Sequence, residues 1–104
     1  MLDLQKNNFQ EIINNNNICV FDFYSTYCVP CKIVEKNLLE LESDYKNKIF
    51  FAKINIENFN NLSAELQILS VPTLLIFKEK KEVQRLTGNI NKKNITLILD
   101  ELSK

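Results

Sequence analysis

Hydrophobic residues along the chain fall into two alternating patterns. Three short runs are rich in β-branched and aromatic residues and predict buried strands over 18–24, 49–55 and 73–77. Between them, apolar residues recur at helical spacing, which predicts amphipathic helices. We expect helices from Phe9 to about Asn14, from Cys28 to about Tyr45, from Leu62 to near Ser70, and around a closing stripe at Ile95, Ile98, Leu99 and Leu102.

Residues at the ends of these segments refine the prediction. The Leu62, Leu66 and Leu69 side chains should share one helix face, and the helix should stop before Pro72 because a residue preceding proline avoids the α region. The run 14–17 is all asparagine and predicts a connection that tolerates left-handed backbone. A very short strand at 2–4 and a hairpin strand at 83–86, entered through a charged loop at 78–81, complete the prediction.

Strands that alternate with helices, followed by a hairpin and a last helix, indicate one α/β domain over residues 1–104. We expect a mixed central sheet of about five strands, flanked by about four helices that cover both faces. Functional sites in such sheets lie beyond the carboxyl ends of the strands.

Charge gives no hint of a charged partner. The chain carries 13 basic and 13 acidic residues, which argues against nucleic acid, membrane and acidic substrates. The first residues lack the pattern of a secretory signal, so we expect a cytoplasmic protein whose thiols are kept reduced.

The chemistry of the chain centres on Cys28 and Cys31. The two thiols lie three residues apart where a predicted strand gives way to a helix. A thiol at a helix start is favoured as thiolate by the unpaired N–H groups there, which makes Cys28 the expected nucleophile. Pro30 fits the first helical turn, where a missing N–H costs nothing. Because side chains at i and i+3 are neighbours, the pair can form and open a disulfide reversibly.

Two other interpretations of these cysteines are weaker. A zinc site would need four ligands, and the chain offers only Cys19 as a further thiol and has no histidine. A purely structural disulfide would close too small a loop to stabilise the fold much. Redox chemistry without a metal is therefore the favoured interpretation. Cys19, inside a predicted strand, is expected to be an inert buried side chain.

Two charged residues interrupt predicted buried strands. Asp22 and Lys53 each lie mid-strand, where a charge is costly unless it is paired or used. A buried ion pair between them is the simplest interpretation, and it does not exclude a catalytic role. Desolvation should raise the pKa of Asp22 unless Lys53 pairs with it closely.

Taken together, Asp22, the motif Tyr27-Cys28-Val29-Pro30-Cys31-Lys32, Lys53, Val71-Pro72-Thr73 and Thr87-Gly88 resemble the thioredoxin family over essentially the full length. The resemblance implies that Pro72 is a cis proline beside the disulfide and that the backbone of Val71 pairs with an extended substrate; without it, Pro72 would simply open a strand. It implies that Asp22, with Lys53 beside it, exchanges the proton of Cys31. A contact surface around the nucleophile is implied at Tyr27, Val29, Pro30, Ile56, Val71, Thr73, Gly88 and Asn89.

The implied activity is reduction of protein disulfides by a reversible Cys28–Cys31 disulfide, with no bound cofactor. The implied partners are disulfide-containing proteins and an external thioredoxin reductase, and we expect a monomer. The chain departs from the family at Tyr24 and Tyr27, where tryptophans are usual, at Val29, where glycine is usual, and in the loop at 78–81, which lacks a glycine and is expected to be longer. The rival hypotheses are a more oxidising exchange protein and an interaction subunit with little redox turnover.

Overall fold

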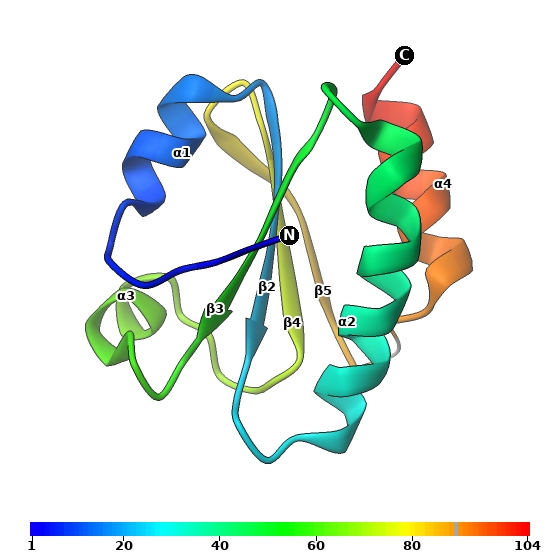
Figure 1. Ribbon diagram of the computed structural model, residues 1–104. Coiled ribbons are helices and arrows are strands. Elements are labelled where there is room, and N and C mark those ends of the chain that lie inside the picture. Colours follow the sequence, from blue (N-terminus) through cyan, green and yellow to red (C-terminus); the bar gives the residue numbers. More distant parts are fainter. Residues whose placement is uncertain (89) are drawn as a thin grey trace.

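Residues 1–88 and 90–104 are described in the computed structural model, drawn in Figure 1. The strands are β1 (Leu2–Asp3), β2 (Ile18–Tyr24), β3 (Phe50–Asn55), β4 (Thr73–Lys78) and β5 (Lys81–Thr87). The helices are α1 (Phe9–Asn15), α2 (Val29–Glu42), α3 (Asn60–Glu65) and α4 (Lys92–Leu102), and a 3₁₀ turn over Ser43–Tyr45 follows α2. The predicted α/β class, with five strands and four helices, is confirmed.

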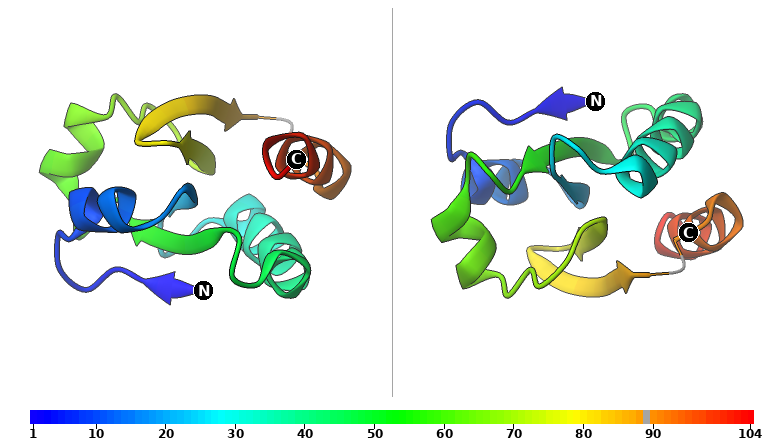
Figure 2. Two further views of the ribbon diagram at one scale, coloured as in Figure 1. Left: turned by 90° about the horizontal axis from the view of Figure 1, so that it is seen from above. Right: turned by 90° about the horizontal axis from the view of Figure 1, so that it is seen from below.

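One mixed sheet organises the molecule, in the strand order β1-β3-β2-β4-β5. Strands β1, β3 and β2 run parallel, whereas β4 is antiparallel to both β2 and β5. Helices α1 and α3 cover one face of the sheet, and α2 and α4 cover the other (Figure 2). The carboxyl ends of β2, β3 and β5 therefore lie at the same end of the sheet as the start of β4.

The central strands are buried on both sides because their successive side chains feed two separate cores. In β2, Ile18 and Val20 pack with the helices α2 and α4, while Cys19, Phe21 and Phe23 pack on the side of α1 and α3. By the same alternation, Asp22 and Tyr24 belong to the α2 face. This explains why β2 is apolar nearly throughout rather than at every second residue.

The asparagine run does not end α1 in the way we expected. Asn16 follows the helix with extended backbone, at φ −136° and ψ 133°, and not in the left-handed region. Its side-chain amide instead donates a hydrogen bond to the Ile12 carbonyl at 2.9 Å. A side-chain hydrogen bond thus satisfies a carbonyl group at the end of α1, where a left-handed backbone turn was expected.

The hairpin loop is shorter than predicted. Lys78 pairs with Lys81, so only Glu79 and Lys80 form the turn, and both have positive φ, 52° and 71°. Such a two-residue turn matches the twist of the strands, and it forms here without glycine. The Glu79 N–H donates to the Asn17 carbonyl at 2.8 Å, which ties the turn to the start of β2.

Helix α3 is also shorter than predicted. It ends at Glu65, and Gln67 turns the chain with a φ of 56°. Arg85 on β5 donates to the carbonyls of Leu66 and Gln67 at 2.9 and 3.0 Å, which holds this end in place. The placement of Leu69 on the buried helix face is therefore wrong: its side chain is 93% exposed.

None of the helices in the described part of the chain has the length and apolar character needed to cross a bilayer.

Because α3 ends early, substitutions of Leu62 and Leu69 should differ in their effect on the free energy of unfolding. Leu62→Ala should lower the free energy of unfolding by about 2 to 4 kcal/mol, because it opens a cavity in a packed core. Leu69→Ala should change it by less than about 0.5 kcal/mol, because that side chain has little to lose. Urea unfolding of both variants measures the difference. Equal destabilisation would mean that the helix continues through Leu69 in solution.

Candidate functional site

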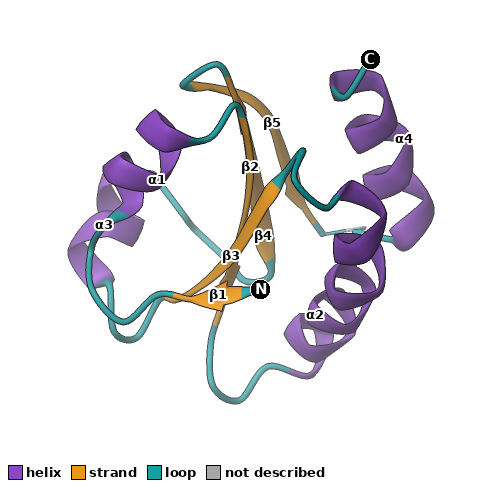
Figure 3. Ribbon diagram, turned by 45° about the horizontal axis from the view of Figure 1, so that its top comes forward, coloured by secondary structure: helices purple, strands orange, loops and turns teal. Residues whose placement is uncertain are grey.

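The two cysteines of the predicted motif lie where β2 passes through a short loop into α2 (Figure 3). Cys28 is the N-cap of α2, with extended backbone at φ −133° and ψ 101°, and Pro30 lies in the first turn as predicted. Cys28 and Cys31 form a disulfide with their Cα atoms 5.2 Å apart. The sequence placed both residues correctly because the helix start depends on local signals: a capping position followed by proline.

The two sulfurs have different surroundings. Cys28 is partly exposed, and its Sγ accepts a hydrogen bond from the Cys31 N–H at 3.2 Å. Cys31 is only 3% exposed. An N–H at a helix start favours negative charge on the sulfur that it faces, so the arrangement suits a thiolate at Cys28. A protein substrate can reach Cys28 more easily than Cys31.

A row of charged side chains crosses the sheet beneath α2. Asp3 on β1 is paired in register with Lys53 on β3, and Lys53 is paired in register with Asp22 on β2. Asp22 is 0% exposed, and neither of its carboxylate oxygens has a hydrogen-bond partner among the described residues. An unpaired buried carboxylate is costly, so this group is unfavourable for the fold when it is ionised.

Lys53 does not form the ion pair with Asp22 that the sequence suggested. Its ammonium pairs with Glu35 of α2, and its side chain is 24% exposed. The ammonium also lies 5.2 Å from the centre of the Tyr24 ring. The interpretation of Asp22 and Lys53 as a buried ion pair is therefore wrong, although the two residues are neighbours in the sheet as the resemblance implied.

Glu35 is a site residue that sequence analysis missed. Sequence analysis did not select it because it lies outside the apolar stripe of the helix, which runs through Val34 and Leu38. The signal was its position four residues after Cys31, which puts both side chains on one face of α2. That face lies over the charged row.

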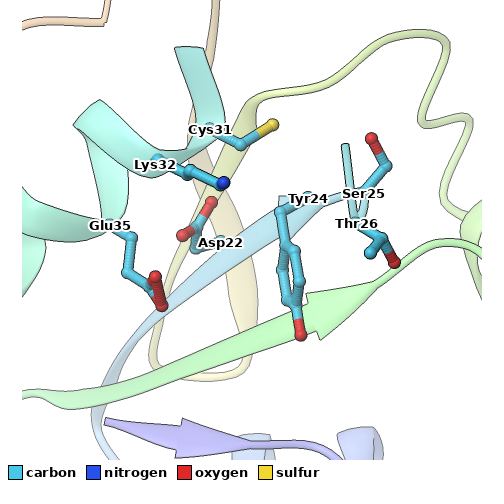
Figure 4. Close-up of a pocket in the computed structure, with 7 residues that line it drawn as sticks. All are labelled: Asp22, Tyr24, Ser25, Thr26, Cys31, Lys32 and Glu35. Carbon is cyan, nitrogen blue, oxygen red and sulfur yellow. The ribbon is translucent and has the colours of Figure 1, made fainter. Parts of the chain in front are cut away.

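A pocket of about 90 Å³ lies between the end of β2 and the first turns of α2. Figure 4 shows the Asp22 and Glu35 carboxylates lining this pocket beneath Cys31 and Lys32. The volume can accommodate several water molecules. The pocket is therefore lined by both the buried Asp22 carboxyl and the buried Cys31 side chain.

The electrostatics of the pocket follow from this geometry. Burial raises the pKa of the Asp22 carboxyl to about 7; the Glu35 carboxylate adds to the rise, and the Lys53 ammonium partly opposes it. Burial lowers the pKa of Lys53, but the hydrogen bond and charge of Glu35, together with the charges of Asp3 and Asp22, outweigh that effect and leave its pKa raised. Near neutral pH, Asp22 can both accept and donate a proton.

Cys19 lies apart from this chemistry. It is the free cysteine of the described chain and is fully buried on the α1 side of β2. Burial raises the pKa of its thiol to about 11. It is thus a poor nucleophile, in line with the inert role that the sequence suggested.

The remaining predicted residues gather around the same end of the sheet. The Val71–Pro72 peptide bond is cis, as the resemblance implied, and Thr73 pairs with Phe23 of β2 and Thr87 of β5. Those pairings bring the start of β4 and the end of β5, followed by Gly88, next to the β2–α2 loop. Ile56 is tied to the end of β2 by its N–H, which donates to the Tyr24 carbonyl at 2.9 Å.

The apolar side chains at this end differ in exposure. Tyr27 and Val29 are exposed, as a contact surface requires, whereas Ile56 is partly buried against the α3 core. Leu69 is exposed in the loop that leads to Pro72, and sequence analysis missed it because it assigned this residue to a helix. Asn89, which the resemblance placed in the contact surface, lies outside the described residues.

Comparison with known proteins identifies this architecture. The family model described as Thioredoxin matches residues 1–101. The thioredoxin of Buchnera aphidicola is 33% identical over 102 residues, which cover 97% of this chain and 94% of the relative. Thioredoxin 2 of Chlorobaculum tepidum is 37% identical over 95 residues, which cover 90% and 87%.

Solved structures agree on the fold. A mutant thioredoxin from Halobacterium salinarum superposes with a TM-score of 0.88 at 21% identity, covering 99% of this chain and 90% of that one. Oxidised mitochondrial thioredoxin 3 from Saccharomyces cerevisiae also gives 0.88, at 24% identity, covering 98% and 95%.

The unpaired Asp22 makes a prediction about stability and pH. The pKa of Asp22 in the folded protein, about 7, lies above its ordinary value of 3.8. The stability that the protonated carboxyl contributes is therefore fully present below pH 3.8 and is lost as the pH rises through about 7. Asp22→Asn removes this loss. Relative to wild type, the free energy of unfolding of the oxidised variant should rise by about 2 to 3 kcal/mol between pH 5 and pH 8.

Urea unfolding of the oxidised proteins at the two pH values measures this change. Glu40→Gln is a suitable control, because Glu40 is exposed on α2 and pairs with Lys92, away from the pocket. It should keep the pH dependence of wild type. A constant difference between Asp22→Asn and wild type would show that Asp22 titrates near its ordinary pKa.

Proposed function

The chain belongs to the thioredoxin family and is a thiol–disulfide oxidoreductase that reduces disulfides through the Cys28–Cys31 dithiol, and within that activity we propose a role for each site residue. Cys28 attacks the substrate, Cys31 resolves the mixed disulfide, and Asp22 carries the proton of Cys31. One observation carries this division: Cys28 is partly exposed at a helix start, whereas Cys31 is buried above the unpaired carboxyl of Asp22.

In the first step, the Cys28 thiolate attacks one sulfur of the substrate disulfide. A Cys28–substrate disulfide forms, the substrate S–S bond breaks, and the other substrate sulfur leaves as a thiolate. The helix start supports the required thiolate at Cys28. Tyr27 and Val29 flank the attacking sulfur as exposed side chains, which suits contact with a protein surface.

In the second step, Asp22 accepts the proton of the Cys31 thiol across the pocket. The Cys31 thiolate then attacks Cys28 Sγ, the internal disulfide forms, and the second substrate thiolate leaves. Two electrons pass from the dithiol to the substrate. A base with a pKa near neutrality suits this transfer, because it is partly ionised and still basic enough to take the proton. In this proposal Lys53, which is paired in register with Asp22, acts on the Asp22 carboxyl only through the charge of its ammonium.

Substrate binding uses the end of the sheet around the disulfide. The backbone of Val71, held next to the cis bond of Pro72, pairs with an extended segment of the substrate. Thr73 fixes this turn, because its hydroxyl donates to the Ser70 carbonyl at 2.7 Å. Pro30 shapes the first turn of α2, and Ile56, Gly88 and Asn89 complete the surface in this proposal.

The family implies disulfide-containing substrates and a reductase that regenerates the dithiol, and no bound cofactor is expected. Within these limits, we place the protein in the cytoplasm as a monomer that acts on protein disulfides and is recycled by a thioredoxin reductase. The balance of 13 basic and 13 acidic residues supports the exclusion of nucleic acid and membranes as partners.

The division of roles predicts the outcome of a trapping experiment. Cys31→Ser should accumulate a mixed disulfide with insulin through Cys28, because no second thiol is placed to release it. Cys28→Ser should trap at least about tenfold less, because the remaining thiol is buried. Non-reducing gels measure both adducts. The double variant Cys28→Ser/Cys31→Ser, which keeps only Cys19, should trap none.

Equal trapping by the two single variants would contradict the assignment of the nucleophile. Strong trapping by the double variant would show instead that Cys19 becomes accessible, contrary to its burial in β2.

A further inference from the structure

Glu35, which lines the pocket and pairs with Lys53, has no part in the roles assigned so far. In the sheet, Lys53 lies between two aspartates, Asp3 on one side and Asp22 on the other. Either could have received its ammonium. The ammonium pairs instead with Glu35, which reaches down from α2, and Asp22 keeps no partner among the described residues.

We infer that Glu35 is a positioning residue of the exchange reaction: it holds the Lys53 ammonium away from Asp22 and so keeps Asp22 a buried carboxyl without a counter-ion. The inference rests on the proposed role of Asp22 as the proton carrier of Cys31. On this inference, Asp22 remains without a counter-ion because of Glu35 on α2, and not because of burial alone.

The geometry limits where the Lys53 ammonium can go. It lies over the ring of Tyr24, 5.2 Å from the centroid, and the Tyr24 hydroxyl donates to Asp3 at 2.9 Å. Tyr24 therefore meets the ammonium with its ring and the aspartate on β1 with its hydroxyl. That hydroxyl occupies one oxygen of Asp3, whose charge still acts on Lys53, so the acidic neighbours that remain if the Glu35 charge is removed are Asp3 and Asp22.

The groups that face Asp22 indicate that the charges of Glu35 and Lys53 affect its ionisation most. From α2 come Cys31, Lys32 and Glu35, which line the pocket with it, and Lys32 is exposed to solvent. From β3 comes Lys53, whereas β4 presents only the apolar Leu74 in register. On β2 itself, Tyr24 is bound to Asp3. The charge balance at Asp22 is thus set chiefly by the Glu35–Lys53 pair, whose carboxylate raises and whose ammonium lowers the pKa of Asp22.

The consequence for the reaction concerns the pH at which Cys31 can lose its proton. If Glu35 is neutral, the Lys53 ammonium is free to approach Asp22 and stabilise its carboxylate. Asp22 then ionises at lower pH, and it becomes a weaker base toward Cys31. The acid side of the pH profile for resolving the mixed disulfide should move in the same direction.

The primary test follows the titration of Asp22 by carboxyl ¹³C NMR in the full, oxidised protein. In Glu35→Gln, the midpoint should fall by about 1 pH unit or more relative to wild type. Glu40→Gln, which neutralises an exposed glutamate of the same helix away from the pocket, should leave it unchanged. An unchanged midpoint in Glu35→Gln, in a variant whose NMR spectrum shows it folded, would overturn the inference.

A double-mutant cycle asks whether Glu35 acts through Lys53. In the Lys53→Gln background, the further change Glu35→Gln should lower the Asp22 midpoint by less than half as much as it does alone, because there is no ammonium to release. An equal fall in both backgrounds would mean that Glu35 acts only by direct repulsion, and the positioning role would be wrong.

A kinetic readout separates this inference from the proposed function. The release of substrate from a Cys28 mixed disulfide by Cys31 is measured across pH. In Glu35→Gln, the acid limb of this pH–rate profile should shift by the same amount as the Asp22 midpoint. If the midpoint falls and the acid limb does not move, Glu35 does control Asp22, but Asp22 is not the proton carrier. In that case its role in the proposed function, and with it the role of Glu35 in the reaction, fails.

Discussion

The site depends on one constraint: a carboxyl group is buried in the sheet beneath a helix without a hydrogen-bond partner in the described chain. Folding buries Asp22, and its oxygens gain no hydrogen-bond partner among the described residues. Burial, with a further rise from the Glu35 carboxylate and an opposing effect of the Lys53 ammonium, raises its pKa to about 7. The carboxyl is thus unfavourable for stability when it is ionised, and for the same reason it can take a proton near neutral pH.

The rest of the architecture places this carboxyl where it can act. The parallel pairing of β2 with β3 puts Lys53 beside it, and α2 lays Cys31 and Glu35 over it. The same helix begins at Cys28, so the N–H groups that favour a thiolate and the buried carboxyl belong to one junction. Antiparallel β4 begins at this end of the sheet, so Pro72, which immediately precedes it, lies next to the disulfide loop.

Local signals carried much of the sequence prediction. The strands, the start of α2 at Cys28 and the end of the sheet at which the cysteines lie follow from short apolar runs, a cap and a proline. Glu35 was missed because its role depends on how α2 is rotated over the sheet, which an apolar stripe fixes only approximately. Leu69 was misplaced because Gln67 adopts positive φ and ends the helical spacing. The hairpin loop was predicted too long because Glu79 and Lys80 form a tight turn without glycine.

The central claim is that Asp22 takes the proton of Cys31 during resolution of the mixed disulfide. Single-turnover release of a thiol reporter from Cys28, followed across pH 5 to 9 in wild type and in Asp22→Asn, tests it most directly. We expect the wild-type rate to rise through an inflection near 7, and the variant to be slower by about tenfold or more without that inflection. A variant with the wild-type rate and the wild-type inflection would contradict the account.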